Sequence, residues 1–413
     1  MAANILVNVQ TYQESGLAFM QNLNCFVSTA NTRFREFEKM EANLGSTVTF
    51  DLPPRFVTGN SLVVSFQPAD QRIQSLTVDQ QENVSYAFSA QQFIFNVEDY
   101  MEKYGKGAIK ELSAKIEINV AQNCVTNTYR FYGDGVTPIN SYNQLAQALS
   151  LFRNYGSITH DVKGYLSDIA VAQIVGTGLN QFAMKRNDDI AMSWEVGEFS
   201  RCEWYQSNLL PVHVAGTEGQ SGSTLTVVST TLDSFGAVTA ITFSGTHSAT
   251  DANSVKQYDK FEFNDGVSGF PNLRYLTFVG HTPSSNSVQF QATADAASTG
   301  GSQVTVQISP ALQVNQTNYQ NISVPIVAGM QVSVLPTHRA GMITAGNSLF
   351  LAMPTLPDQT PFPTGNAYDP DTGVSLRQYY GAQFGQNSQA MVHDCIWGST
   401  LVAENSMSLI FPV

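Results

Sequence analysis

Charged residues are scarce in this chain of 413 residues. They make up 13% of it, which is about half the usual fraction in a soluble globular protein. Small and uncharged polar residues (Gly, Ser, Thr, Asn and Gln) take their place. Because surface charge keeps proteins apart in solution, this composition suits a chain whose surface is largely covered by neighbours. Proteins of the β-rich extracellular class share it.

Basic residues are fewer still. The chain has 20 Lys+Arg against 33 Asp+Glu, and its formal net charge is -13. Affinity for nucleic acid comes mainly from cations that neutralise phosphates, and a basic stripe is the expected sign of it. The sequence contains no such stripe, so we do not expect the chain to grip DNA. A weakly adhesive wall that encloses DNA remains compatible with this charge.

Cysteine is rare, and its four positions are Cys25, Cys124, Cys202 and Cys395. Zinc sites need clustered thiolates, and disulfide scaffolds are shorter and richer in cysteine. We therefore expect buried, reduced thiols in a protein made in a reducing cytoplasm. The first residues lack the basic and apolar regions of a secretory signal, and no run reaches the roughly 18 apolar residues of a membrane span. We expect neither signal nor membrane segment.

Motifs for catalysis, cofactors and metals are missing. No H-x-x-x-H spacing and no phosphate-binding G-x-x-x-x-G-K-[ST] loop occurs. GTGLNQ at 176–181 lacks the third glycine of a dinucleotide fingerprint, and the turn at 369–373 has Tyr380 where a calcium loop needs glutamate. Neighbouring residues in the strand pattern at 393–395 (His-Asp-Cys) point to opposite faces, which favours strand core over a nucleophile with its base. We expect no catalytic, cofactor or metal site, and no enzyme.

Periodicity predicts a mixed first half. Residues 1–46 indicate an arm with a helical piece, and 47–96 a long extended hairpin or loop whose strands include 48–52 and 84–88. Helices are predicted at 97–122, 141–152, 167–175 (capped by Ser167) and near 188–194, and strands at 162–166, 202–206 and 210–216. The residues on the apolar face of the first helix are Met101, Tyr104, Ala108, Leu112, Ile116 and Val120.

At Gly216 the composition shifts sharply. Residues 217–336 are rich in Ser, Thr and Gly, and short alternating runs such as TLTVVST and QVTVQIS are separated by turn residues. This pattern predicts a small all-β barrel or sandwich without helices. After Pro336 mixed composition returns, with a Pro-rich loop and strands in VSLRQYY, AMVHDCI and LVAENSMSLIF. A β-domain inserted within a mixed α/β domain is the simplest interpretation.

The order of these parts resembles the α+β Hong Kong 97-type major capsid fold. More narrowly, the chain is similar to the coat proteins of lederbergvirus-type short-tailed phages, which carry an inserted β-barrel (the I-domain). The local sequences that carry the narrower resemblance are WEVGEFSRCEWYQSNLLPVHVAG (194–216), NISVPIVAGMQVSVLPTH (321–338) and GVSLRQYYGAQFGQNSQAMVHDCIWGSTLVAENSMSLIF (373–411). The resemblance implies an N-terminal arm (1–46), an E-loop (47–96), a P-domain with a spine helix (97–156), the first part of an A-domain (157–216), the I-domain (217–336) and a return to A-domain and P-domain strands (337–413).

The function implied by the resemblance is that of a major capsid (coat) protein. Copies would join into pentamers and hexamers of an icosahedral shell that encloses packaged double-stranded DNA without sequence-specific binding. Members of the family assemble around a scaffolding protein, leave one vertex to a portal protein and expand when DNA is packaged. A decoration protein is a further candidate partner. The implied location is the virion, after synthesis in the cytoplasm of a bacterial host.

Candidate subunit contacts lie in the arm and the E-loop. The hypothesis for the arm is that its acidic residues meet a basic scaffolding helix. Some shells of this fold crosslink an E-loop lysine to an asparagine, but residues 40–102 contain no lysine, so we expect non-covalent contacts here. The candidate contact residues are Glu14, Glu36, Glu38, Glu41, Arg55, Phe56 and Arg72.

Two other classes of function stay open. One is another phage or surface structural protein, such as a tail tube or a β-rich fibre, although predicted helices over 97–152 and the lack of internal repeats argue against a fibre. The other is a β-rich polysaccharide-active enzyme, because aromatics and amides suit a sugar groove. A glycosidase needs two carboxylates about 5–10 Å apart, and the sequence supplies no motif for such a pair.

Overall fold

The computed structural model describes most of the chain. The described residues are 25–32, 47–58, 66, 71–89, 105–155, 160–178, 198–278, 280–315, 318–346, 348–360, 362, 364–368, 374–382 and 388–413. The arm residues Glu14, Glu36, Glu38 and Glu41, the helix predicted near 188–194 and the turn at 369–373 lie outside them. The chain forms two compact units: unit 1 comprises 1–50, 73–124 and 347–401, and unit 2 comprises 51–72, 125–346 and 402–413.

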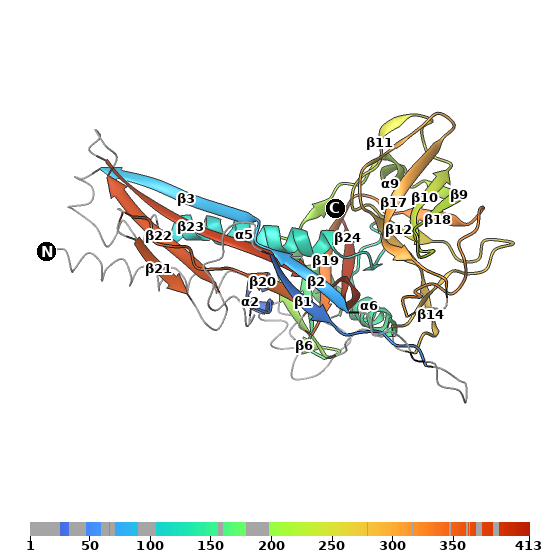
Figure 1. Cartoon of the computed structure of the whole chain (residues 1–413), viewed down its shortest axis with the longest axis horizontal. Helices are drawn as coiled ribbons and strands as arrows, with labels where there is room; N and C mark the ends of the chain where they lie inside the picture. The colour runs from blue at the N-terminus through green and yellow to red at the C-terminus, as the bar shows by residue number, and fades with distance from the viewer. Residues whose placement is uncertain are drawn as a thin grey trace. The chain divides into compact units, whose positions relative to one another are not determined.

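Unit 1 is built on long antiparallel strands. β23 (Ser388–Leu401) pairs with β22 (Ser375–Ala382), which in turn pairs with β21 (Thr364–Tyr368), and the last part of β23 pairs with β20 (Leu349–Ala352). β3 (Gln80–Ser89) also runs along β23 (Figure 1), in a register from Ser89 opposite Ser388 to Gln80 opposite Trp397. The strands predicted in VSLRQYY and AMVHDCI are thus confirmed. β21 was not predicted, because Thr364 and Gly365 belong to the expected Pro-rich loop.

One long helix, α5 (Lys106–Thr126), lies along these strands. Ala108, Leu112, Ile116 and Val120 are all buried, as the predicted apolar face requires. Asn119 donates a hydrogen bond to Gln80 of β3 at 3.0 Å, and Asn123 donates one to the backbone oxygen of Ser399 of β23 at 2.6 Å. The helix continues four residues beyond its predicted end at 122. Cys124 and Val125 in this last turn are buried, and the periodicity of the sequence did not indicate that burial.

The predicted hairpin has a different partner strand. β1 (Thr47–Leu52) pairs with β2 (Arg72–Thr77), whereas the expected partner at 84–88 lies in β3 and pairs with β23. The run RIQSLT of β2 gave no strand signal because its two apolar residues, Ile73 and Leu76, are three positions apart and do not alternate with polar ones. In the structure Ile73 is exposed and Leu76 is buried. The predicted strands at 48–52 and 84–88 are thus present, but they do not form a hairpin with each other.

Unit 2 contains a seven-stranded sheet. Its order is β4 (Phe131–Tyr132), β24 (Ser406–Pro412), β19 (His338–Ala345), β5 (Val162–Leu166), β7 (Cys202–Gln206) and β6 (Glu198–Phe199), and β8 (Val212–His213) pairs with β19. The helices α6 (Tyr142–Asn154) and α7 (Asp168–Gly178) share one apolar core with these strands through residues such as Leu149, Ile174 and Leu409. Ser167 caps α7 as predicted, accepting from the Ala170 N–H at 3.2 Å.

The predicted all-β barrel is present. Six strands close it in the order β10 (Val238–Ser244), β17 (Gln303–Leu312), β15 (Gln289–Ala292), β12 (Lys260–Phe263), β18 (Gln331–Val334) and β9 (Thr224–Leu232) (Figure 1). Its interior holds stacked aromatic rings, with the Phe261 and Phe290 centroids 5.0 Å apart. Two short pairs accompany it: β11 (Asp251–Val255) with β16 (Ala296–Ser298), and β13 (Arg274–Leu276) with β14 (Pro283–Ser287).

One expectation for the barrel region was wrong. A short helix, α9 (Thr217–Ser221), opens the segment in which no helix was predicted. Five residues are too few to show a helical period, and Gly222 ends the helix in a left-handed conformation, with φ 65°.

The barrel is inserted at one point of the sheet. All its strands lie in sequence between β8 and β19, and those two strands pair antiparallel with His213 opposite His338. The chain therefore leaves the sheet and returns to it on neighbouring strands. Within the described part of the chain, no helix has both the length and the apolar character to cross a membrane.

Candidate functional site

The structure brings together two of the predicted contact residues, Arg55 and Arg72, on a carboxylate of the same chain. Pro53 and Pro54 follow β1, and Arg55 comes directly after them. Its Nη2 lies 2.5 Å from Glu404 Oε1, and Arg72 forms an ion pair with the same oxygen. Arg72 also donates to the backbone oxygen of Pro53 at 3.3 Å. The two ends of the segment 51–72 are thus tied to one another and to Glu404.

Glu404 lies in the single helical turn η3 (Ala403–Asn405) before β24. Burial raises the pKa of Glu404, but the charges of Arg55 and Arg72 outweigh burial and hold the pKa below its ordinary value. The arginine side chains are only 14% and 17% exposed, and their charges are paired with a carboxylate of the same chain. Sequence reasoning missed Glu404 because it lies more than 300 residues away and its sequence resembled part of a strand.

The aromatic residues of the same segment face solvent. Phe56, the third predicted contact residue described here, is 56% exposed, and Phe66 is 95% exposed. Burying a phenylalanine side chain stabilises a protein by about 1.5–3 kcal/mol. Arg55 and Arg72 are therefore turned toward their own chain, whereas Phe56 and Phe66 are turned toward solvent. Phe66 was not predicted, although an aromatic residue in a polar loop is a signal that sequence alone offers.

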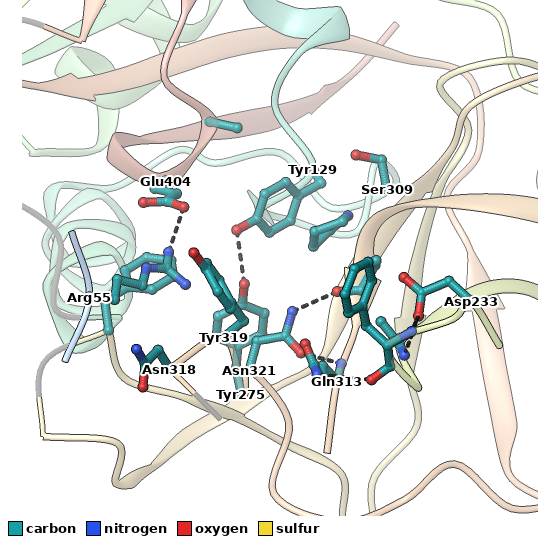
Figure 2. Close-up of a pocket in the computed structure, with 16 residues that line it drawn as sticks. Arg55, Tyr129, Asp233, Tyr275, Ser309, Gln313, Asn318, Tyr319, Asn321 and Glu404 are labelled. Atoms are coloured by element: carbon teal, nitrogen blue, oxygen red, sulfur yellow. Dashed lines mark hydrogen bonds and ion pairs between the residues drawn. The ribbon is translucent and has the colours of Figure 1, made fainter. Parts of the chain in front are cut away.

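A pocket of about 950 Å³ opens beside Arg55 (Figure 2). Most of its side chains are aromatic, amide or small. Tyr129 and Tyr275 share a hydrogen bond between their hydroxyl groups at 2.9 Å, and the Arg55 guanidinium lies 4.4 Å from the centre of the Phe278 ring. The residues that line the pocket are Arg55, Tyr129, Asp233, Phe235, Ala237, Tyr275, Phe278, Ser309, Pro310, Ala311, Gln313, Asn318, Tyr319, Asn321, Ala403 and Glu404.

A buried arginine supports this wall. The Arg130 guanidinium lies 4.5 Å from the Tyr155 ring centre and 5.2 Å from that of Phe278, and it donates to the backbone oxygen of Glu404. Contacts of this kind contribute roughly 0.5–2 kcal/mol each. Arg55 and Arg130 thus place cations near the same phenylalanine ring, and together they fix the segment 51–72, η3 and the loop after β13 against one another.

The pocket does not present the acid of a glycosidase. Of its lining residues, Asp233 and Glu404 carry carboxylates. Asp233 accepts from the N–H groups of Phe235 and Ala237 at 2.9 and 2.8 Å, and so caps the β9–β10 turn. A general acid requires a raised pKa, whereas the pKa of Glu404 is lowered by its arginine partners. Both carboxylates of the lining are therefore held by partners within the chain, Asp233 by backbone N–H groups and Glu404 by two arginines.

The residues His393, Asp394 and Cys395 form strand core, as predicted. All three are buried, and Asp394 forms an ion pair with Arg377, whose Nε lies 2.9 Å from Oδ1. Burial raises the pKa of the Cys395 thiol and lowers the pKa of His393 to about 4. All four cysteines are free thiols: Cys124, Cys202 and Cys395 are buried and Cys25 is half-buried.

No family model matches the chain, and no curated protein sequence matches it. Solved structures do resemble it. One is of Mycobacterium phage Che8 (7% identity, covering 94% of this chain and 90% of that chain, TM-score 0.46). Others are the capsid of cyanophage P-SCSP1u (10% identity, 95% and 93% covered, TM-score 0.43) and the capsid of Ralstonia phage GP4 (7% identity, 94% and 87% covered, TM-score 0.43). At such identities no residue role is carried from those chains to this one.

Proposed function

We propose that this chain is the major capsid protein of a tailed double-stranded-DNA phage, with the Hong Kong 97-type fold and an inserted I-domain. The observation that carries the proposal is the segment 51–72. Its arginines are neutralised within the chain and its aromatic side chains Phe56 and Phe66 are exposed. Closed shells grow through heterologous contacts, in which one surface of each copy meets a different surface of the next. Two exposed phenylalanines on a segment anchored by Arg55 and Arg72 supply one half of such a contact.

The architecture supports the same proposal. A long helix runs beside long antiparallel strands in unit 1, and a closed barrel is inserted between paired strands of the sheet in unit 2. These are the parts that the sequence resemblance implies for an E-loop, a spine helix and an I-domain. In this assignment 47–96 is the E-loop, 97–156 holds the spine helix and 217–336 is the I-domain.

The net charge of the chain favours a protein that encloses DNA over one that binds it tightly. A net charge of -13 and the lack of a basic stripe leave packaged DNA without the cations that bind phosphate. The partners in this proposal are other copies of the chain, in pentamers and hexamers, together with a scaffolding protein and a portal protein. The arm residues Glu14, Glu36, Glu38 and Glu41 remain the proposed contact with the scaffold. The proposed location is the virion, and no enzymatic activity is proposed.

The experiment is assembly. The chain is expressed alone and together with the products of its neighbouring genes, and the high-molecular-weight fraction is examined by electron microscopy. Closed shells are the expected result. Open tubes would favour the tail-tube alternative, and a soluble monomer under all conditions would overturn the proposal and return attention to the pocket as a saccharide site.

A further inference from the structure

A cluster of ionisable side chains, all buried except the partly buried His213, joins the barrel to the sheet in unit 2. We call His213, Asp259, Lys260 and His338 the neck cluster. Asp259 precedes β12 and is fully buried, and its Oδ1 lies 2.7 Å from His213 Nε2 on β8. Its Oδ2 accepts from the backbone N–H groups of Lys256 and Gly216 at 2.8 and 3.1 Å. One carboxylate therefore joins the barrel to the strand and the linker through which the chain enters it.

His338 stands where the chain returns to the sheet. It is fully buried and lies opposite His213 in the β8–β19 register, with the two ring centres 5.4 Å apart. Its Nδ1 lies 2.7 Å from the backbone oxygen of Pro336. Because a carbonyl only accepts, Nδ1 carries the proton of the neutral ring. No atom of the described residues hydrogen-bonds to the buried Nε2, so a proton placed there would be without an acceptor.

The groups around His338 make such a proton costly. Lys260, at the start of β12, is buried and donates to the backbone oxygen of Thr128 and to Ser408 Oγ, the latter at 3.3 Å. The pKa of His338 is lowered to about 4: burial is the largest cause, the Pro336 hydrogen bond opposes it, and the nearby Lys260 and His213 act in the same direction as burial. β24, which pairs with β19 at Pro412, has no titratable side chain, and Arg339 follows His338 in β19. Asp259 supplies the carboxylate of the cluster, on the side of His213.

We propose that the neck cluster is an acid-released latch, in which neutral His338 holds the barrel linkers against the sheet and its protonation loosens them. A proton on Nε2 adds a positive charge beside Lys260 and His213 without a new partner, which is a strongly destabilising state for a buried group. Loosening the linkers admits water to Nε2, and the water accepts the hydrogen bond that the added proton lacks inside the fold. The latch is a property of the single chain and does not depend on the function proposed above.

The test is hydrogen–deuterium exchange of the full-length protein, with protection factors corrected for intrinsic exchange at each pH. We expect peptides covering 212–217 and 335–340 to lose protection by up to about tenfold per pH unit between about pH 6.5 and 4, while α6 keeps its protection. In H338N the asparagine amide replaces the Nδ1 donor to Pro336 but does not titrate, so the neck peptides should show no such transition.

The matched control is H393Q. Burial lowers the pKa of His393 to about 4 as well, but that residue lies in unit 1, so the variant should leave the transition at the neck unchanged. A wild-type neck without a transition, or an unchanged transition in H338N, would overturn the latch. If H338N fails to fold, exchange at the histidine C2–H of the wild-type protein decides instead. A His338 midpoint near 4 together with neck loosening supports the latch, and a midpoint near 6.5 overturns it.

Discussion

Gln289 on barrel strand β15 and Phe131 on β4 exchange two hydrogen bonds. The Phe131 N–H donates to Gln289 Oε1 at 2.9 Å, and Gln289 Nε2 donates to the Phe131 carbonyl at 3.0 Å. The side-chain amide thus occupies the place that the backbone of a neighbouring strand would take. Gln291 donates in the same way to the backbone oxygen of Thr126 at 2.8 Å. Two barrel glutamines therefore fasten the barrel to residues 126–131 without extending the sheet.

Replacing Gln289 by leucine should destabilise unit 2. The buried N–H and C=O of Phe131 would lose their partners, and each unsatisfied group costs about 1–3 kcal/mol. We expect the free energy of unfolding to fall by about 2–4 kcal/mol in urea titrations. Q307L is the control, because Gln307 is exposed on β17 of the same barrel. Equal stability of Q289L and Q307L would show that the paired hydrogen bonds do not hold the barrel.

Glu404→Gln should release the segment 51–72. The variant leaves Arg55 and Arg72 without their shared negative charge, and hydrogen bonds to charged groups contribute about 1.5–3 kcal/mol, less here because the side chains are partly exposed. We expect faster proteolytic cleavage within 51–72. E203Q is the control, because Glu203 is exposed on β7 and contacts Tyr205. Unchanged cleavage in E404Q would contradict the anchoring role.

The charge on Glu404 also gives a pH dependence. Its pKa in the folded chain lies below the ordinary value of 4.5, so its contribution to stability is present above about pH 4.5 and is lost as the pH falls through the folded pKa. We expect the stability difference between wild type and E404Q to shrink when the pH is taken below 4.5. Urea titrations at pH 6 and pH 3.5 measure this stability difference. A difference that is larger at pH 3.5 than at pH 6 would contradict a stabilising charge on Glu404.

Phe66→Ala should weaken assembly without weakening the single chain. The side chain is 95% exposed, so the free energy of unfolding should change by less than about 0.5 kcal/mol. Loss of a buried phenylalanine at each contact should raise the concentration needed for assembly by about tenfold or more. V136A is the matched control, because Val136 is 71% exposed on unit 2 outside the segment. Light scattering against concentration measures assembly, and equal curves for the two variants would remove Phe66 from the contact.

Glu117→Gln should loosen the short helix α2 (Cys25–Thr29). The buried Glu117 carboxylate of α5 accepts from the N–H groups of Cys25, Phe26 and Val27 at 2.9, 2.8 and 3.3 Å. The glutamine side chain has one NH2 group in place of a carboxylate oxygen, and that group cannot accept a hydrogen bond from these backbone N–H groups. We expect amide exchange in 25–31 to accelerate by about tenfold or more. E111Q, at an exposed position of the same helix, should leave that exchange unchanged. Equal exchange in both variants would exclude the cap.

Local patterns predicted the elements whose burial follows a regular period. Leu112 and Ile116 in α5, Leu145 and Leu149 in α6, and the apolar residues of the alternating barrel strands are buried, each on one face of its own element. The β1–β2 pairing and β21 were missed because their strands lack alternation or follow prolines. β2 and β21 form because each hydrogen-bonds to a neighbouring strand, β1 and β22 respectively. Which strands become neighbours in the fold cannot be deduced from the periodicity of a single segment.

Sequence reasoning selected three of the described site residues, but as contacts between subunits. Arg55, Phe56 and Arg72 were selected as the basic and apolar features of a lysine-free loop, and the structure brings both arginines to one carboxylate. Their ion pairs lie within the chain, because Glu404 reaches them from the C-terminal segment. The contact of Phe56 with another copy remains a proposal. The neck cluster was beyond sequence reasoning, since its histidines lie 125 residues apart and meet only because β8 and β19 pair.

Electron cryomicroscopy of the assembled particles, with icosahedral averaging, shows whether copies of this chain build a shell through the segment 51–72. We expect a closed shell in which residues 51–72 of one copy contact a neighbouring copy and Phe66 is buried in that contact. A helical tube, or a closed shell in which 51–72 touches only its own chain, would contradict it.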